Sequence, residues 1–205
     1  YDHGIFMATF GERHSIPFLE ELCKLSGRPG FYAPHFHFTH QPDRASDIMN
    51  MAEDARRRGI PVYTQGSCQP LSLTSTLDKA YILKARHPWP STEDHTELRR
   101  IFTNPAFRDA FRETLKKPDS QHVFKGRWDW VPIAVVGLEK NEDLVGRTIA
   151  EIAEDREQDP LDTFLEIGLE ENFATKFTFF ILNMDEDGVA NLISNDGTLI
   201  SLSDA

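Results

Sequence analysis

Residues 60–64 read Ile-Pro-Val-Tyr-Thr and form the third of three segments near the start of the chain that we expect to be extended. The first is residues 4–10, Gly-Ile-Phe-Met-Ala-Thr-Phe, and the second is the aromatic-rich segment 28–39. Residues 15–27 and 42–59, which separate them, carry apolar residues at helical intervals. This strand–helix–strand–helix–strand order with short connections predicts parallel strands joined by right-handed crossovers.

The regular alternation stops between residues 67 and 127, which we expect to form a helical insertion after a strand. It resumes with expected strands at 131–136, 177–182 and 199–202, separated by helices. The fold class predicted is α/β, a partial (β/α)8 barrel of about six strands, whereas a complete barrel has eight strands in ~250 residues. We therefore expect residues 1–205 to be a fragment of a single barrel domain, with its site at the carboxyl ends of the strands.

The composition excludes several classes of partner. The chain has a formal net charge of -11, from 22 Lys and Arg against 33 Asp and Glu, so we expect neither a nucleic acid nor a membrane as partner. No apolar run approaches the ~18 residues of a membrane-spanning helix. Two cysteines make no disulfide framework, and a reducing cytoplasm is the expected location. The chain starts at Tyr1 without Met and stops soon after an apolar run, which indicates a piece of a longer protein.

The strongest candidate for chemistry is Asp204, which follows the last apolar run. A carboxylate at the carboxyl end of a barrel strand can ligate a divalent metal or accept a proton from water. An aspartate after a strand can equally cap the next helix, and the spacing does not distinguish the two roles.

Three histidines, His35, His37 and His40, follow one another at the end of the second expected strand. Residues two apart on a strand share a face, so His35 and His37 could bind one metal ion. The simpler interpretation, which the sequence alone favours, buries Phe36 and Phe38 and leaves the histidines exposed to solvent.

The third expected strand ends in polar residues, from Tyr63 through Gly66 and Ser67 to Cys68. The glycine could let the backbone approach a ligand, and the hydroxyl groups could donate to a carboxylate or carbonyl. An ordinary turn after a strand explains the same residues. Cys68 has no assignable base beside it, and the chain contains neither a phosphate-binding glycine loop nor a nucleophile elbow.

Three segments in order resemble a known family. They are Leu-Val-Gly-Arg-Thr-Ile-Ala-Glu-Ile-Ala at 144–153, Asp-Pro-Leu-Asp at 159–162 and Leu-Ile-Ser-Leu-Ser-Asp-Ala at 199–205. Together they resemble the C-terminal half of the N-acyl-D-amino-acid deacylases, which belong to the amidohydrolase superfamily. The resemblance implies a metal-dependent TIM-like barrel with one or two divalent ions, zinc being expected.

The resemblance also implies roles for single residues. Asp204 falls on the last-strand aspartate, which lies at the metal and acts as general base on the hydrolytic water. Ser67 and Tyr63 match a segment that contacts the substrate, and His35 lies near a metal-ligating histidine. Phe10 stands where the family has another ligating histidine, and the family's first-strand His-x-His would precede Tyr1.

The function expected from this resemblance is hydrolysis of the amide bond of a small N-acyl-D-amino acid. Two alternatives stay open: a cyclic amidase acting on hydantoins or dihydropyrimidines, and a barrel that binds a small metabolite without hydrolysing it. We expect the 205-residue chain to be inactive by itself, since it lacks the first-strand ligands. The acyl and side-chain preferences and the oligomeric state are not predicted.

Overall fold

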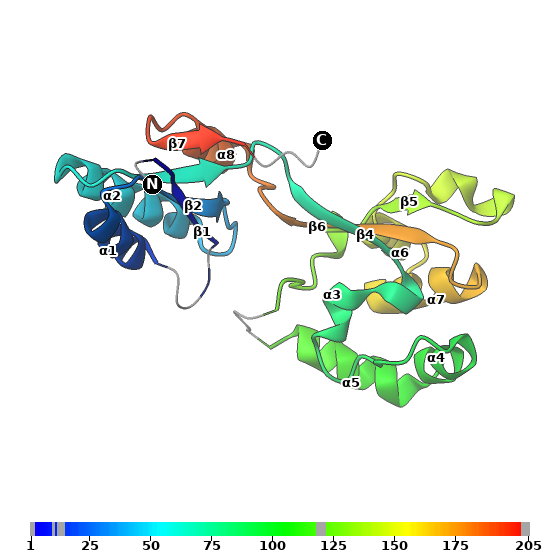
Figure 1. Cartoon of the computed structure of the whole chain (residues 1–205). Helices are drawn as coiled ribbons and strands as arrows, with labels where there is room; N and C mark the ends of the chain where they lie inside the picture. The colour runs from blue at the N-terminus through cyan, green and yellow to red at the C-terminus, as the bar shows by residue number, and fades with distance from the viewer. Residues whose placement is uncertain (1–2, 10, 12–14, 118–121, 202–205) are drawn as a thin grey trace. The chain divides into compact units, whose positions relative to one another are not determined.

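The computed structural model describes residues 3–9, 11, 15–117 and 122–201. These form a mixed α/β fold that divides into two compact units (Figure 1). The first unit comprises Tyr1–Leu71 and Leu182–Ala205, and the second comprises Ser72–Ile181. Most of the expected insertion, residues 67–127, therefore belongs to the second unit.

The first unit is built on a parallel sheet of four strands, in the order β1-β2-β3-β7. The strands are β1 (Phe6–Thr9), β2 (Gly30–His35), β3 (Val62–Gly66) and β7 (Thr198–Ile200), and every neighbouring pair is parallel. This confirms the parallel sheet predicted from the alternation of elements. A closed barrel is not formed by the strands that the structure describes.

Two helices with clear end signals cover one face of this sheet. The side chain of Ser15 caps α1 (Ile16–Ser26) by accepting from the amide of Phe18, and Gly27 ends it with φ 67°. The second helix, α2 (Pro42–Arg57), begins with a proline in its first turn. Both helices pack on the sheet through a buried cluster, comprising Ala8, Ile16, Leu19, Cys23, Tyr32, Ile48, Ala52, Ala55, Ile60 and Val62.

The opposite face of the same sheet carries exposed apolar side chains. Ile5, Met7 and Leu199 are 66%, 64% and 50% exposed. Together with Phe31 and Gln65 they line a hollow of about 120 Å³. We call this surface the open face of the sheet.

The second unit has a sheet of three strands in the order β4-β6-β5. These are β4 (Leu71–Thr76), β6 (Lys176–Leu182) and β5 (Ile133–Val135). The sequence pattern missed β4. It also predicted strands 131–136 and 177–182 as members of one parallel barrel, which is wrong, because β5 and β6 pair antiparallel.

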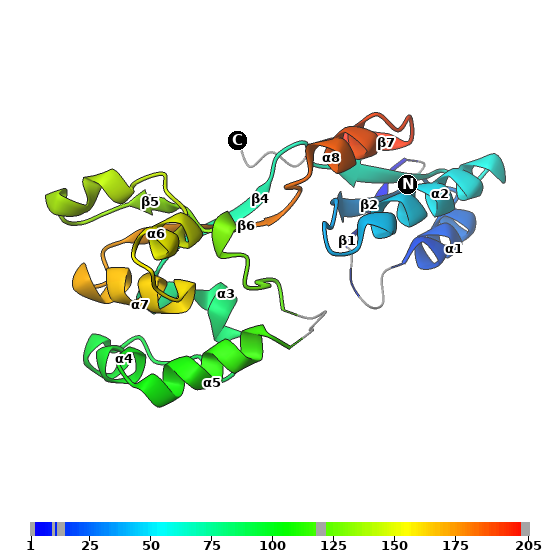
Figure 2. The same cartoon turned by 180° about the vertical axis from the view of Figure 1, so that it is seen from behind.

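Figure 2 shows the helices of the second unit from behind. The buried residues of this unit include an aromatic core. The ring centroid of Trp89 lies 5.0 Å from that of Phe102 and 4.9 Å from that of Phe111. The ring centroids of Phe164 and Phe177 are 4.4 Å apart. The helices of this unit are α3 (Tyr81–Lys84), α4 (His95–Phe102), α5 (Pro105–Leu115), α6 (Ile149–Asp155) and α7 (Pro160–Glu170), with short 3₁₀ helices at Leu77–Lys79, Trp128–Trp130 and Glu139–Leu144.

The remaining helix, α8 (Glu186–Ile193), belongs to the first unit and contacts α2 and β7. Asp185 caps it by accepting from the amide of Gly188. Among the described helices, none combines the length and the apolar content needed to cross a membrane.

Candidate functional site at the carboxyl ends of the parallel strands

The parallel strands of the first unit end close to the same line. In the sheet register Thr9 pairs with Ala33, His35 pairs with Gly66, and Gly66 pairs with Ile200. The four strands therefore end at one edge of the sheet, which we call the carboxyl edge. In parallel α/β folds this is the edge where ligands bind.

His35, the last residue of β2, is buried with 1% of its surface exposed. Its Nε2 lies 3.1 Å from the carbonyl oxygen of Ala45 in α2, and a carbonyl can only accept, so Nε2 carries the proton. Burial lowers the pKa of His35 to about 4, outweighing the hydrogen bond to Ala45, and the nearby charge of Arg44 lowers it further. The imidazole is therefore neutral at pH 7, and its buried Nδ1 has no hydrogen-bond partner among the described residues.

His37 is also buried, so the interpretation that placed these histidines in solvent is wrong. The strand ends at His35, and the two imidazoles therefore do not share a strand face. Instead the ring of His37 packs against Gly188 in α8. The same interpretation is correct for Phe36, which is buried, and for His40, which is exposed, whereas Phe38 is only partly buried.

Ser67 directly follows β3 and is buried. Its hydroxyl lies 3.2 Å from both the amide nitrogen and the carbonyl oxygen of Gln69. Gly66, which the sequence suggested might admit a ligand, instead admits Leu192, because a Cβ atom at position 66 would lie 2.3 Å from that leucine's Cδ2. The glycine thus serves packing between β3 and α8.

Tyr63 lies near the amino end of β3, apart from the carboxyl edge. Its ring stacks on Phe31 with centroids 5.5 Å apart, and the guanidinium of Arg56 lies 5.5 Å from the ring centroid. Four residues along a strand correspond to ~13 Å, so the structure does not bring Tyr63 and Ser67 together.

Asp204 and Phe10, the other residues singled out in the sequence, lie outside the described residues. Within the described ranges, no group of three or more His, Cys, Asp or Glu side chains could hold a metal ion. Two buried histidine nitrogens, Nδ1 of His35 and Nδ1 of His37, have no hydrogen-bond partner among the described residues. The neutral imidazole of His35 is the form of histidine that binds metals.

Sequence reasoning missed Asn183, which the structure places at the same edge. It follows β6 and is 4% exposed, and its side chain contacts the segments after β2 and β3. A signal was present in the sequence, because an asparagine directly after an apolar strand is one of the few residues that adopt a positive φ readily.

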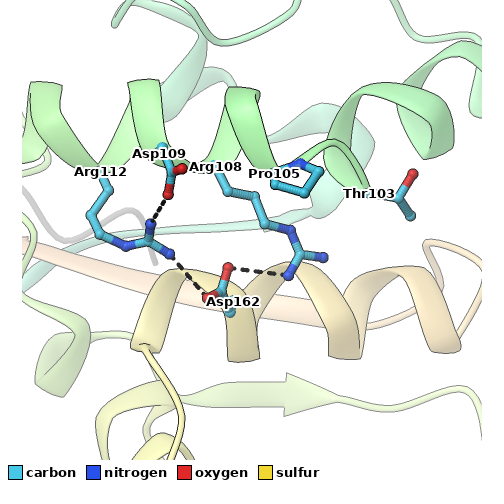
Figure 3. A pocket seen from close by; sticks show the side chains of 6 residues that line it. All are labelled: Thr103, Pro105, Arg108, Asp109, Arg112 and Asp162. Atoms are coloured by element: carbon cyan, nitrogen blue, oxygen red, sulfur yellow. Dashed lines mark hydrogen bonds and ion pairs between the residues drawn. The ribbon is translucent and has the colours of Figure 1, made fainter.

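A second cavity, of about 450 Å³, lies in the other unit (Figure 3). It is lined by Thr103, Pro105, Arg108, Asp109, Arg112 and Asp162. Asp162 bridges the two arginines: its Oδ1 lies 3.1 Å from Arg108 Nη1, and its Oδ2 lies 3.0 Å from Arg112 Nη2.

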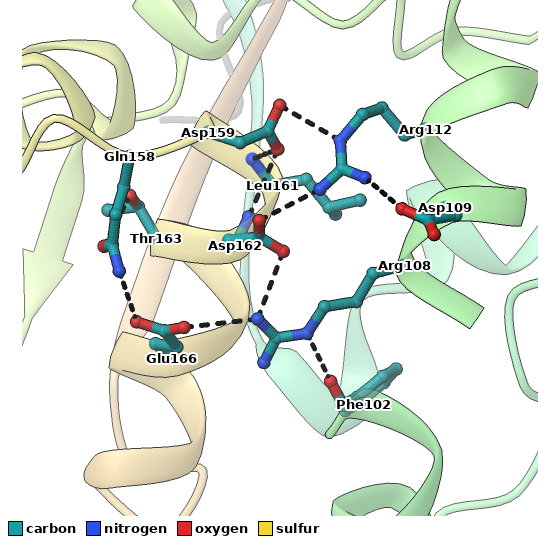
Figure 4. Close-up of polar contacts among 10 residues, drawn as sticks. All are labelled: Phe102, Arg108, Asp109, Arg112, Gln158, Asp159, Leu161, Asp162, Thr163 and Glu166. Carbon is teal, nitrogen blue, oxygen red and sulfur yellow. Dashed lines mark hydrogen bonds and ion pairs between the residues drawn. The ribbon is translucent and has the colours of Figure 1, made fainter. Parts of the chain in front are cut away.

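The surrounding ion pairs argue against an anion site in this cavity (Figure 4). Arg108 also pairs with Glu166, and Arg112 also pairs with Asp109 and Asp159. Two cations thus face four carboxylates, and an anionic ligand would meet a net negative charge. The network instead joins α5 to α7.

No family model matches the chain, and no curated protein matches it. A solved D-aminoacylase, described as defining a novel subset of amidohydrolases, is 13% identical with a TM-score of 0.41, covering 95% of this chain and 31% of that one. A D-aminoacylase studied for its binuclear metal center is 14% identical with a TM-score of 0.42, covering 97% and 32%.

The third structure is the N-acyl-D-glutamate deacylase of Bordetella bronchiseptica in complex with zinc and a phosphonate inhibitor. It is 13% identical with a TM-score of 0.41, covering 94% of this chain and 30% of that one. The chain thus spans about a third of the length of the solved structures it matches. Identities of 13–14% do not assign it to a family.

Proposed function

We propose that this chain is part of a metal-dependent amidohydrolase that removes the acyl group from N-acyl-D-amino acids. The observation that carries the proposal is the succession of residues 144–153, 159–162 and 199–205, which resemble the deacylase family in that order. The parallel sheet supports it, because its strands end together at one edge, and so does the free Nδ1 of His35 at that edge.

In this proposal Asp204 is the general base. Its carboxylate takes a proton from the attacking water and delivers it to the leaving amine. His35 and Asp204 would hold the metal, and Ser67 would contact the substrate. One or two zinc ions supply Lewis acidity, which lowers the pKa of water and polarises the amide carbonyl.

The setting of the activity belongs to the proposal too. The substrate is a small molecule in the cytoplasm, and neither nucleic acid nor membrane takes part. We assign the activity to the full-length protein and propose that the 205-residue chain alone has none. The parallel sheet that the structure describes has four strands, half of the eight that a barrel site uses.

One observation favours a non-catalytic alternative. Phe10 stands where the resemblance places a metal-ligating histidine, and a phenyl ring cannot bind a metal ion. A barrel with that position lost could bind a small metabolite without hydrolysing it. Cyclic amides such as hydantoins are a further possible substrate class, since related folds support many chemistries.

The test uses the full-length protein and its Asp204→Asn variant. Asn cannot accept the proton, so we expect kcat for N-acyl-D-amino acids to fall by about 10²- to 10⁴-fold. Asp196→Asn is the matched control, because it removes an exposed carboxylate from the turn before β7 and should leave kcat unchanged.

The possible outcomes distinguish the three candidate functions. Turnover of Asp204→Asn at the wild-type rate would contradict the role of Asp204. A full-length protein that contains no zinc, does not respond to added zinc and hydrolyses neither linear nor cyclic amides would favour the binding function. Hydrolysis of hydantoins but not of N-acyl-D-amino acids would select the cyclic alternative.

A further inference from the structure

We propose that Asn183 is a positioning residue for the site at the carboxyl edge, an inference that rests on the proposed function. Asn183 joins the segment after β2, which follows His35, to the segment after β3, which begins with Ser67. It touches neither substrate nor metal in this role and acts through the residues that it holds.

The contacts of Asn183 use both ends of its amide. Its Oδ1 accepts from the backbone amide of His37 at 2.7 Å. Its Nδ2 donates to the carbonyl oxygens of Ser67 at 2.9 Å and Gln69 at 3.1 Å. Its own backbone amide donates to the carbonyl of His37 at 3.2 Å. One residue therefore fixes two segments that are distant in the sequence.

Asn183 occupies a buried turn. Its φ is 60°, in the left-handed region that asparagine adopts more readily than most residues with a side chain. Only 4% of its surface is exposed, so its bonds are shielded from water. The turn and the hydrogen bonds of the amide are therefore compatible in this residue type without backbone strain.

In this proposal the hydrogen bonds of Asn183 fix the distance between His35 and Ser67. His35 lies two residues before His37, and Ser67 is held through its own carbonyl. Without the amide of Asn183, the ends of β2 and β3 stay paired in the sheet, but the segments that follow them lose their common attachment. The proposed ligand and substrate contact would then no longer be held at a fixed distance.

The experiment compares three variants of the full-length protein. Asn183→Gly removes the amide and suits φ 60° at no steric cost, so the turn itself can form. Asn183→Asp keeps the acceptor for the His37 amide but places a carboxylate beside two carbonyl oxygens. Asn172→Gly is the matched control, since Asn172 has φ 51° but lies exposed in the other unit.

Three readouts are measured at a temperature where every variant is folded: hydrogen exchange of the His37 amide, zinc affinity, and kcat and KM for N-acyl-D-amino acids. Asn183→Gly loses all three side-chain hydrogen bonds of Asn183. We expect exchange of the His37 amide at least about 10-fold faster, and zinc affinity and kcat each lower by at least about 10-fold, because one buried hydrogen bond already corresponds to about a factor of 10. We expect Asn183→Asp to lower zinc affinity and kcat with the His37 amide still protected, and Asn172→Gly to match wild type.

A purely structural role would lower the melting temperature of Asn183→Gly and leave the zinc affinity and kcat of the folded protein unchanged, and this result would overturn the inference. The inference can fail separately from the proposed function. If wild type hydrolyses no amide, the proposed function fails, and zinc affinity and exchange still decide on Asn183: unchanged values in Asn183→Gly overturn its role.

Discussion

The imidazole of His37 lies directly against the backbone of Gly188 in α8. A Cβ atom placed on Gly188 would lie 2.5 Å from Cδ2 and 2.6 Å from Nε2 of that ring. No real side chain fits at such distances, so the glycine is required by the histidine that faces it. The contact ties the segment after β2 to the first turn of a helix far along the chain.

Gly188→Ala should therefore destabilise the protein although alanine is the better helix former. Overpacking costs ~1–3 kcal/mol, and the gain in helix propensity offsets at most about 1 kcal/mol. Chemical denaturation measures the change in the free energy of unfolding. Asn191→Ala, at an exposed position of the same helix, is the control and should be neutral or slightly stabilising. Equal stabilities of the two variants would refute the tight contact.

Glu171 should be a main anchor of the second unit. Its buried carboxylate accepts from the amides of Gly137 at 2.5 Å and Leu138 at 3.2 Å, and from Asn141 and Thr175 at 2.9 and 2.8 Å. Glu171→Ala leaves these donors without their acceptor, and we expect a loss of about 3 kcal/mol.

The same carboxylate should make stability depend on pH. Burial raises the pKa of Glu171, but the four hydrogen bonds outweigh it and leave the pKa below its usual value. A lowered folded-state pKa stabilises above the unfolded value, near ~4.3, and this contribution is lost as the pH falls through the folded pKa. Denaturation at pH 7 and pH 3 measures it. Glu170→Ala, which removes an exposed ion pair with Lys140, should change stability by less than about 0.5 kcal/mol.

Asp78 should make a second contribution to stability that is lost in acid. Its buried carboxylate accepts from the Thr76 hydroxyl at 2.5 Å and lies 3.1 Å from His95 Nε2. Burial raises its pKa, but the bonds from Thr76 and His95 leave the pKa below its usual value. Stability from Asp78 is thus present above ~3.9 and lost as the pH falls further.

Asp78→Asn should lower stability at pH 7 by about 1–2 kcal/mol and flatten its pH dependence below ~4. Denaturation across this range measures both effects. The exposed Glu154→Gln serves as control and should retain the wild-type profile. A wild-type pH profile in Asp78→Asn would rule out the assigned contribution.

The ion-pair network between α5 and α7 should contribute little to the free energy of unfolding for the number of charged side chains that it contains. Asp162→Asn breaks the bridge between Arg108 and Arg112, but both arginines keep other carboxylates. Because these side chains are partly exposed, we expect a loss of ~1 kcal/mol that shrinks in high salt. Denaturation in low and high salt measures it, with Asp109→Asn, at a 75% exposed side chain, as a near-neutral control. A salt-independent loss would contradict an electrostatic origin.

The first unit could be predicted from sequence because its signals are local. Residues 4–10, 15–27, 42–59 and 60–64 contain β1, α1, α2 and most of β3 as the structure has them. The periodicity of apolar residues and the glycine and proline at helix ends determine these elements within a few residues of chain.

The second unit depends on pairings that no local pattern encodes. β4 is rich in serine and threonine and lacks an apolar run, and it becomes a strand beside β6, where Thr74 and Thr178 pair through their hydroxyls at 2.8 Å. The order of elements likewise does not determine that β5 and β6 run antiparallel.

The sequence predicts where the candidate site lies, but it does not predict the contacts of the side chains there. The pattern identifies the ends of β2 and β3, yet the burial of His35 and His37 depends on packing against α2 and α8, which the local pattern does not encode. Asn183 went unnoticed for the same reason, since its partners are in other segments.

Gly66 and Leu192 show what such contacts mean for the evolution of the chain. The leucine occupies the space that any side chain at position 66 would need. A larger residue at the end of β3 can be accepted only after a smaller one appears in α8. The two positions must therefore change together, and sequences related to this one should record the pair as a correlated substitution.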